Sequence, residues 1–255
     1  MSDILIVSNL GKQFGGIKAV DGLSFAVREG DIHGLIGPNG AGKTTTFNLI
    51  SGFYKPTHGS VKFFDEEISG LRMHHVARKG VIRTFQHSTL FAELTVLDNV
   101  LVGTHMMFKP SLTAAFLGRE RQSRAKAIER ANEVLEFFGL QAFVDQLAGE
   151  LSHGHQRALG MAVAMASQPK ILLLDEPFTG MNPEETQTMM GLMGKLRDTG
   201  ITLLLVEHDM TAIMGLCDRI TVMNFGKLLT EGKPLEIRNH PDVIEAYLGK
   251  QKNAS

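Results

Sequence analysis

The stretch GPNGAGKT, Gly37 to Thr44, decides the fold because it fits the phosphate-binding pattern GxxxxGK[ST]. It follows an apolar run that ends at Ile36 and opens a helical stretch that we expect to run from Lys43 to Ser51. Glycines suit such a loop, because its backbone N–H groups must curl inward around phosphate oxygens. The pattern places Lys43 on the β- and γ-phosphates and the Thr44 hydroxyl on Mg²⁺. We therefore predict a strand, a phosphate loop and a helix here.

The composition indicates a folded chain with one large domain, or a core with a smaller inserted lobe. Of its 255 residues, 43% are hydrophobic, which is ample for a packed interior. The formal net charge of -1 gives no overall field that would favour nucleic acid or an anionic membrane surface. The single cysteine, Cys217, excludes an internal disulfide and fits a reducing compartment.

The apolar runs are too short for targeting or membrane segments. The run at the N-terminus, ILIV, is four residues long, below the length of a signal-peptide core. Ile171 to Leu174 and Leu203 to Val206 are also far below the roughly 18 residues of a membrane-spanning helix. We expect a cytoplasmic protein whose membrane role would pass through a partner.

Two kinds of β structure are predicted. Residues 1–36 contain short strands with glycine turns, typical of an antiparallel β lobe that leads into the phosphate loop. Strand-like sequence returns in residues 59–85, around a polar helical piece near Arg72 to Lys79. Ile171 to Leu174 and Thr202 to Val206 are uninterrupted apolar runs, typical of parallel strands buried on both faces. The later part of the chain is therefore expected to wind as β-α-β.

Helical patterns separate these strands. Residues 95–168 are mainly helical in character, and Arg119 to Phe138 carries an apolar stripe followed by a glycine. The charges on its other face fit a solvated surface, with a docking surface as the alternative. Asn182 is a good cap for another helix, with Pro183 at its first position and Gly200 at its end.

Asp175 and Glu176 directly follow the first buried strand. Adjacent residues that leave a strand point to opposite sides, so the two acids can serve two tasks beside one phosphate. Asp175 suits Mg²⁺, and Glu176 suits polarisation of the attacking water. Alone, the pair would be interpreted as acids that cap a strand end. The phosphate loop upstream makes the catalytic interpretation the stronger one.

Three further segments carry polar groups that fit this chemistry. His208 ends the next apolar strand, at the sheet edge where ligands collect, although a histidine there is also a common structural residue. Gln86, in RTFQ, has a side-chain oxygen that suits Mg²⁺ and water, or is plain polar surface. LSHGHQR, residues 151–157, offers Ser152 and the N–H groups after it as an anion site at the start of a helix, Gln156 to Ser167.

Taken in order, GPNGAGKT, Gln86, LSHGHQR, ILLLDEP, GMNP and His208 resemble the ATP-binding subunits of ABC transporters over nearly the whole chain. The resemblance implies an α/β fold of the P-loop NTPase (RecA-like) type. It has a parallel sheet core, an N-terminal antiparallel β lobe and an inserted helical subdomain. Within this single ABC ATPase domain, residues 1–87 would form the β lobe and the phosphate-loop part of the core. Residues 88–160 would form the helical subdomain with the signature motif, and residues 161–255 the rest of the core and a helical tail.

The resemblance also implies an ATPase that uses ATP and Mg²⁺ and couples hydrolysis to transport. Two such subunits, identical or related, pair head to tail, so that each ATP lies between the phosphate loop of one and Ser152 to Gly154 of the other. Thr179 to Asn182 matches the loop that crosses this dimer. Phe14 falls where the family stacks an aromatic ring on adenine, although plain packing explains such a residue equally well. Gln86 matches the residue that senses the γ-phosphate and borders the groove for the membrane partner.

The implied site residues are as follows. The catalytic residues are Glu176 and His208, and the metal ligands are Thr44, Gln86 and Asp175. The nucleotide contacts are Phe14, Gly37, Pro38, Asn39, Gly40, Ala41, Gly42, Lys43, Thr44, Thr45, Gln86, Ser152 and Gly154.

Longer segments are similar to the ATPases of branched-chain amino-acid importers, of the LivG type: FGGIKAVDG, LFAELTVLDNVLVG, GMNPEE and the ending VIEAYLG. This similarity implies two integral-membrane permease partners, an indirect periplasmic or extracellular substrate-binding protein, no nucleic acid, and a place on the inner face of the membrane. The ATPases of lipopolysaccharide export are an alternative, and a soluble ABC ATPase that works on DNA or ribosomes is a weaker one. A P-loop kinase or GTPase would give residues 151–157 no role.

The signature motif departs from the family pattern at two positions. The usual sequence is LSGGQ, or LSYGQQ in this branch, whereas this chain has His153 and His155 at the third and fifth positions. Gly154, where the backbone must approach phosphate closely, is present. We therefore expect activity to survive these two changes.

Overall fold

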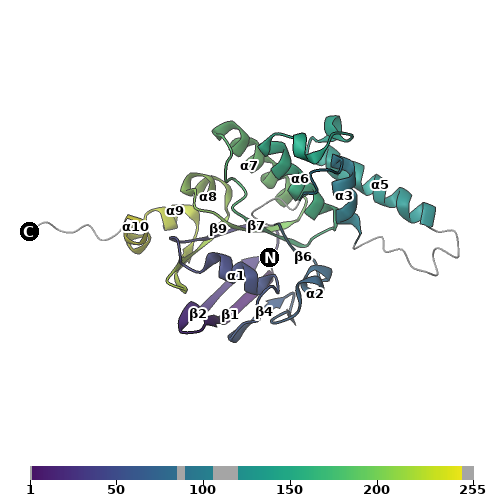
Figure 1. Cartoon of the computed structure of the whole chain (residues 1–255). Helices are drawn as coiled ribbons and strands as arrows, with labels where there is room; N and C mark the ends of the chain where they lie inside the picture. Colours follow the sequence, from purple (N-terminus) through teal and green to yellow (C-terminus); the bar gives the residue numbers. More distant parts are fainter. Residues whose placement is uncertain (1, 85–89, 106–119, 249–255) are drawn as a thin grey trace, which may run out of the picture. The chain divides into compact units, whose positions relative to one another are not determined.

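The computed structural model describes residues 2–84, 90–105 and 120–248 (Figure 1). The chain divides into two compact units. The first unit comprises Met1–Arg83, Lys170–Thr179 and Met193–Ser255, and the second comprises Thr84–Pro169 and Gly180–Leu192. The domain boundaries expected from the sequence, after residues 87 and 160, stay a prediction.

The first unit contains the antiparallel β lobe expected from the sequence. Its described residues form a four-stranded sheet in the order β2-β1-β4-β5, in which every neighbouring pair is antiparallel. Leu23, Phe25 and Val27 of β2 are buried and alternate with more exposed residues, because side chains on a strand point to opposite faces in turn. The strands are β1 (Asp3–Phe14), β2 (Ile17–Arg28), β4 (His58–Phe63) and β5 (Glu66–Glu67).

The same unit contains the predicted parallel sheet, whose described strands follow the order β10-β9-β3-β8-β7-β6. All neighbours are parallel except β10, which pairs antiparallel with β9. Every residue of β7 and β8 is buried, as their apolar runs predicted. The strands are β3 (Ile32–Ile36), β6 (Val81–Arg83), β7 (Ile171–Asp175), β8 (Thr202–Val206), β9 (Arg219–Asn224) and β10 (Lys227–Gly232).

One strand assignment from the sequence was wrong. The sequence predicts that all strands of residues 1–36 belong to the antiparallel lobe, whereas β3 (Ile32–Ile36) lies in the parallel sheet between β8 and β9. The reason is burial: all five residues of β3 are buried, His33 and Gly34 included, as in a central strand covered on both faces. The phosphate loop therefore follows a central parallel strand.

Helix α1 (Lys43–Ile50) is fixed by a shared core. Phe47, Leu49 and Ile50 belong to one buried cluster with residues of both sheets, such as Leu5 of β1 and Leu35 of β3. This packing holds the N-terminal end of α1 at the phosphate loop. The other helices of the first unit are α2 (Met73–Arg78), α8 (Met210–Leu216), α9 (Pro234–Arg238) and α10 (Pro241–Leu248).

The second unit is helical. Helix α3 packs on both α5 and α6, and a Cβ at Gly103 of α3 would lie 2.1 Å from the backbone oxygen of Val163 in α6, so glycine permits this close approach. Ala131 and Leu135 of α5 are buried, as the apolar stripe predicted. The elements are α3 (Val96–Thr104), α5 (Glu120–Phe137), the 3₁₀ turns Gln141–Phe143 and Ala148–Glu150, α6 (His153–Ala166) and the first part of α7 (Pro183–Asp198). None of the helices within the described ranges is long and apolar enough to cross a membrane.

His33 is a buried titratable group in the middle of the parallel sheet. Its Nε2 lies 2.8 Å from the Thr221 hydroxyl of β9, and its Nδ1 has no hydrogen-bond partner among the described residues. Burial lowers the pKa of His33 to about 3, and the positive charge of Arg219 is a second cause. The ring is therefore neutral in the folded chain throughout the ordinary pH range.

Acidification is expected to destabilise the fold through His33. Above about pH 6.5 the ring is neutral in both states, but below it the unfolded chain binds a proton that the folded chain refuses until about pH 3. The free energy of unfolding should therefore fall by about 2 kcal/mol between pH 7 and pH 5 on this account. Urea unfolding at both pH values measures the decrease. His33→Gln should remove most of it, and the exposed control His75→Gln should leave it unchanged.

Candidate nucleotide site

The phosphate loop connects the carboxyl end of β3 to α1 in the first unit. Gly42 caps α1 with a φ of 100°, and a Cβ at this position would lie 2.4 Å from the backbone oxygen of Ala19. Only glycine combines this left-handed conformation with so close a neighbour. The Gly226 N–H donates to the Ala41 oxygen at 2.9 Å, so the turn between β9 and β10 holds the loop from outside.

Lys43 lies inside its own loop. Its Nζ donates to the backbone oxygens of Gly37 at 2.6 Å and Pro38 at 3.1 Å, and the side chain is buried. Burial lowers the pKa of Lys43, and the negative charges of Glu176 and Asp175 oppose that shift. The two carbonyl oxygens accept hydrogen bonds from the Lys43 ammonium, which would donate to phosphate oxygens when a nucleotide is bound. A buried cation within a glycine-rich turn is a suitable binding partner for a phosphate group.

Asp175, the first acid after β7, is held by a cation that the sequence interpretation missed. Its Oδ2 accepts from Nη2 of Arg83 at 2.7 Å, and both side chains are almost fully buried. Arg83 also donates through Nη1 to Asn48 Oδ1 of α1 at 2.6 Å. Arg83 therefore joins the ends of β6 and β7 to the helix after the phosphate loop. An arginine at the end of a predicted strand was the only available signal.

Glu176 has an unusual backbone conformation. Its φ is 48°, in the left-handed region that residues other than glycine rarely adopt. Its N–H donates to the Val206 oxygen of β8 at 2.9 Å, and its Oε2 lies 3.4 Å from the Thr179 hydroxyl. Such a conformation costs on the order of 1 to 3 kcal/mol and is often retained at functional sites. This strain supports the prediction that Glu176 has a catalytic role.

His208 follows β8 at the same sheet edge and is well exposed, at 62% for its side chain. Beside it, Glu207 is buried and accepts the N–H groups of Phe178 at 2.9 Å and His208 at 3.0 Å. Burial raises the pKa of Glu207, and these N–H groups oppose the shift. Glu207 thus ties the turn that carries His208 to the loop after Glu176. The sequence interpretation gave Glu207 no role, since an acid next to a histidine looks like ordinary surface.

The other predicted contacts of the first unit are less enclosed. Thr44 is exposed and Thr45 half-buried at the start of α1. Phe14 is 42% exposed and packs edge-on against Tyr54, with ring centroids 5.2 Å apart. Phe14 thus packs on a neighbouring ring, and its stacking on adenine stays a prediction. Gln86 lies outside the described residues.

The described residues contain no group of three or more His, Cys, Asp or Glu that could hold a metal ion. Mg²⁺ usually binds through one or two carboxylates, waters and phosphate oxygens. Asp175 and the Thr44 hydroxyl are donors of that kind. They fit such an ion without a dedicated cage.

The signature segment lies in the second unit. Ser152 caps α6 and accepts the His155 N–H at 3.3 Å, while Nδ1 of His155 lies 3.0 Å from the same hydroxyl. A Cβ at Gly154 would approach the Glu185 carboxylate to 3.0 Å. The cap at Ser152 was predicted. Helix α6 begins directly after it at His153, three residues before the expected start at Gln156. His155 also packs on Phe143, with ring centroids 4.6 Å apart.

The N-terminus of α7 is stabilised by two reciprocal capping hydrogen bonds. The Glu185 N–H donates to Asn182 Oδ1 at 2.9 Å, and the Asn182 N–H donates to Glu185 Oε2 at 3.0 Å. This is a capping arrangement of the type that stabilises a helix N-terminus. The predicted cap at Asn182, with Pro183 as the first helical residue, is therefore present.

A phosphate loop between a parallel strand and a helix, with an acid pair after another strand of the sheet, defines a P-loop NTPase. The model of the family described as "ABC transporter" matches residues 20–179, and the chain belongs to this family. It is accordingly an ATP-binding ATPase. A second model, described as "Branched-chain amino acid ATP-binding cassette transporter", matches residues 227–252.

The curated relatives match along almost the whole chain. LivG of Salmonella typhimurium, a high-affinity branched-chain amino acid transport ATP-binding protein, is 47% identical over 97% of this chain and 98% of its own length. BraF of Pseudomonas aeruginosa and LivG of Escherichia coli K12, both with the same description, are each 46% identical over the same shares.

Solved structures show the same fold. A nucleotide-free ATP-binding cassette from an ABC transporter matches with a TM-score of 0.86 and 34% identity, over 98% of this chain and 100% of that one. The ADP conformation of an ATP-binding cassette matches with a TM-score of 0.86 and 33% identity over the same shares. A dimeric cassette in a post-hydrolysis state bound to ADP and Pi matches with a TM-score of 0.75 and 26% identity, over 90% and 98%.

Proposed function

We propose that this chain is the ATP-hydrolysing subunit of an importer for branched-chain amino acids or similar small amino acids and amides. The observation that carries the proposal is the similarity of 46 to 47% to LivG and BraF over 97% of the chain. The match of residues 227–252 to a branched-chain amino acid cassette model supports it. These findings favour import over the lipopolysaccharide-export alternative.

In the proposed site, Lys43 binds the phosphates and Glu176 activates water. The Lys43 ammonium exchanges its two carbonyl contacts for phosphate oxygens, and the backbone N–H groups of the loop surround the same phosphates. Mg²⁺, when bound, would neutralise phosphate charge, with Thr44, Gln86 and Asp175 as its protein ligands. Arg83 fixes the orientation of the Asp175 carboxylate.

Glu176 is the proposed general base and His208 the residue that assists it at the γ-phosphate. Glu176 has a left-handed backbone conformation, and its N–H donates to the Val206 oxygen of β8. His208 is exposed on a turn that buried Glu207 holds in place. A base must lie within hydrogen-bond reach of the water it activates, and a firmly held turn reduces the cost of that placement.

The proposed working form is a dimer in which Ser152 and Gly154 of one chain meet the phosphate loop of the other. The dimeric cassette with ADP and Pi is a relative of 26% identity that supports this arrangement. Ser152 and the first N–H groups of α6 form a helix N-terminus, which suits a negatively charged phosphate. The further proposed partners are two permease subunits and, indirectly, a substrate-binding protein, with this chain on the inner face of the membrane.

Reconstitution tests the cargo. The chain is purified with the membrane proteins encoded beside its gene, placed in liposomes and supplied with internal ATP. Uptake of labelled leucine, isoleucine and valine should require ATP and the cognate binding protein, and should be lost in Glu176→Gln. If the neighbouring genes encode lipid-transport proteins and the reconstituted complex takes up no amino acid, amino-acid import is contradicted. The assignment as an ATPase would be unaffected.

A further inference from the structure

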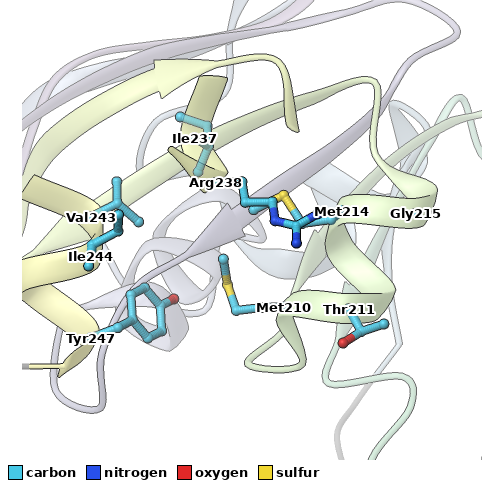
Figure 2. A pocket seen from close by; sticks show the side chains of 9 residues that line it. All are labelled: Met210, Thr211, Met214, Gly215, Ile237, Arg238, Val243, Ile244 and Tyr247. Atoms are coloured by element: carbon cyan, nitrogen blue, oxygen red, sulfur yellow. The ribbon is translucent and has the colours of Figure 1, made fainter. Parts of the chain in front are cut away.

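A pocket of about 570 Å³ lies among the last three helices of the first unit (Figure 2). Small-molecule sites have volumes of about 300 to 1,000 Å³ and are mostly apolar with a few polar groups. This pocket has that composition. Its lining residues are Met210, Thr211, Met214 and Gly215 from α8, Ile237 and Arg238 from α9, and Val243, Ile244 and Tyr247 from α10.

Among the described residues that line the pocket, Arg238 is the only charged one. Within the described part of the chain it has no ion pair and no side-chain hydrogen bond. In Figure 2 its side chain extends from α9 into the pocket, while the methionines lie on α8 and the ring of Tyr247 on α10. The planar guanidinium can donate two parallel hydrogen bonds to a carboxylate, and flexible methionine side chains can pack against an apolar chain. Charge and lining together select an anion with an apolar body.

Tyr247 connects this pocket to the phosphate loop. Its ring lines the pocket, whereas its hydroxyl is buried and forms no hydrogen bond of ordinary geometry with the described residues. Burial raises the pKa of Tyr247 to about 12, and the nearby N–H of Gly37 opposes that shift. Gly37 is the first residue of the phosphate loop.

The other face of α10 borders the same loop. Asp242, Glu245 and Ala246 line a second pocket of about 540 Å³ together with the phosphate-loop residues from Pro38 to Ala41. Helix α10 thus contributes residues both to the apolar pocket and to the second pocket beside the phosphate loop. The two acids make the second pocket a poor site for phosphate.

We propose that the apolar pocket is an effector site for an amphipathic monocarboxylate. Its carboxylate binds Arg238, and its chain packs against Met210, Met214 and the wall of α10. Occupancy holds α10 and the Tyr247 hydroxyl against Gly37, which favours the nucleotide-binding form of the loop. The inference goes beyond the proposed transport role, and its first test requires no hydrolysis.

The first test follows binding of octanoate to the full chain by the ¹³C-methyl resonances of its methionines. Octanoate should shift the signals of Met210 and Met214, assigned with Met214→Leu, and leave those of Met161 and Met165 in α6 unmoved. The neutral isostere octanamide, and octanoate with Arg238→Gln, should each bind roughly five- to tenfold more weakly. No shift at Met210 and Met214, or equal affinity for octanamide, overturns the site.

The second test measures the coupling through Tyr247. Saturating octanoate should tighten ATP binding by about fivefold or more, a typical coupling between two sites, when dissociation constants are measured without Mg²⁺. Tyr247→Phe keeps the ring but removes the hydroxyl, so octanoate should still bind and the effect on ATP should disappear. An unchanged effect of octanoate in Tyr247→Phe, or no effect in the wild type, overturns the coupling. Loss of transport alone bears on the proposed function and not on this site.

Discussion

Lys43→Ala is expected to lower ATP hydrolysis by roughly 100-fold or more. A hydrogen bond to a charged group is worth about 1.5 to 3 kcal/mol, and the loop lysine contacts both the β- and the γ-phosphate. Two lost contacts therefore correspond to about two to four factors of ten. Phosphate release at saturating ATP measures the rate.

The fold should survive this change. The variant loses two hydrogen bonds to Gly37 and Pro38, but it also removes a cation whose charge is disfavoured by burial, which lowers the pKa of Lys43. We expect the two effects largely to offset each other, with an unchanged circular dichroism spectrum. Lys62→Ala, which removes the same charge from an exposed position on β4, is the matched control and should keep full activity. Full activity of Lys43→Ala would remove the phosphate-loop assignment.

The buried strands could be predicted from the sequence because their cause is local. Ile171 to Leu174 and Thr202 to Val206 are continuous apolar runs, and a strand covered on both faces has no polar positions to show. The same rule failed for β3, where His33 and Gly34 interrupt the run. One ring nitrogen of the histidine lies within hydrogen-bond distance of the Thr221 hydroxyl on the neighbouring β9. That pairing cannot be read from residues near His33 in the sequence.

The candidate site divides in the same way. The phosphate loop and the acid pair were visible because their spacing is local and chemically specific. Arg83 and Glu207 were missed because their partners, Asp175 and the Phe178 N–H, are 92 and 29 residues away in the chain. Tyr247 and Gly37 are separated by an even longer stretch of the chain. Such contacts follow from the packing of elements and leave no pattern in either segment.

Glu176→Gln is expected to bind ATP without hydrolysing it. The amide keeps the size and the hydrogen bonding of the carboxylate but cannot accept a proton, so the water is left unactivated. Loss of a general base removes roughly 100- to 10,000-fold of the rate. That slowing should let an ATP-bound dimer persist through gel filtration, whereas the wild type with Mg²⁺ and ATP should elute mainly as a monomer.

Adding Ser152→Arg to Glu176→Gln should dissolve the trapped dimer. In the proposed head-to-tail arrangement the serine of one chain faces the γ-phosphate of the other, and a bulky side chain would fill that space. Ser152 also caps α6 through the His155 N–H, so circular dichroism must show that the helix content is retained. Ser8→Arg, an exposed position on β1, is the control and should leave the dimer intact. A dimer that persists in spite of Ser152→Arg would exclude a shared site between two copies. A Glu176→Gln chain that hydrolyses ATP at the wild-type rate would exclude Glu176 as the general base.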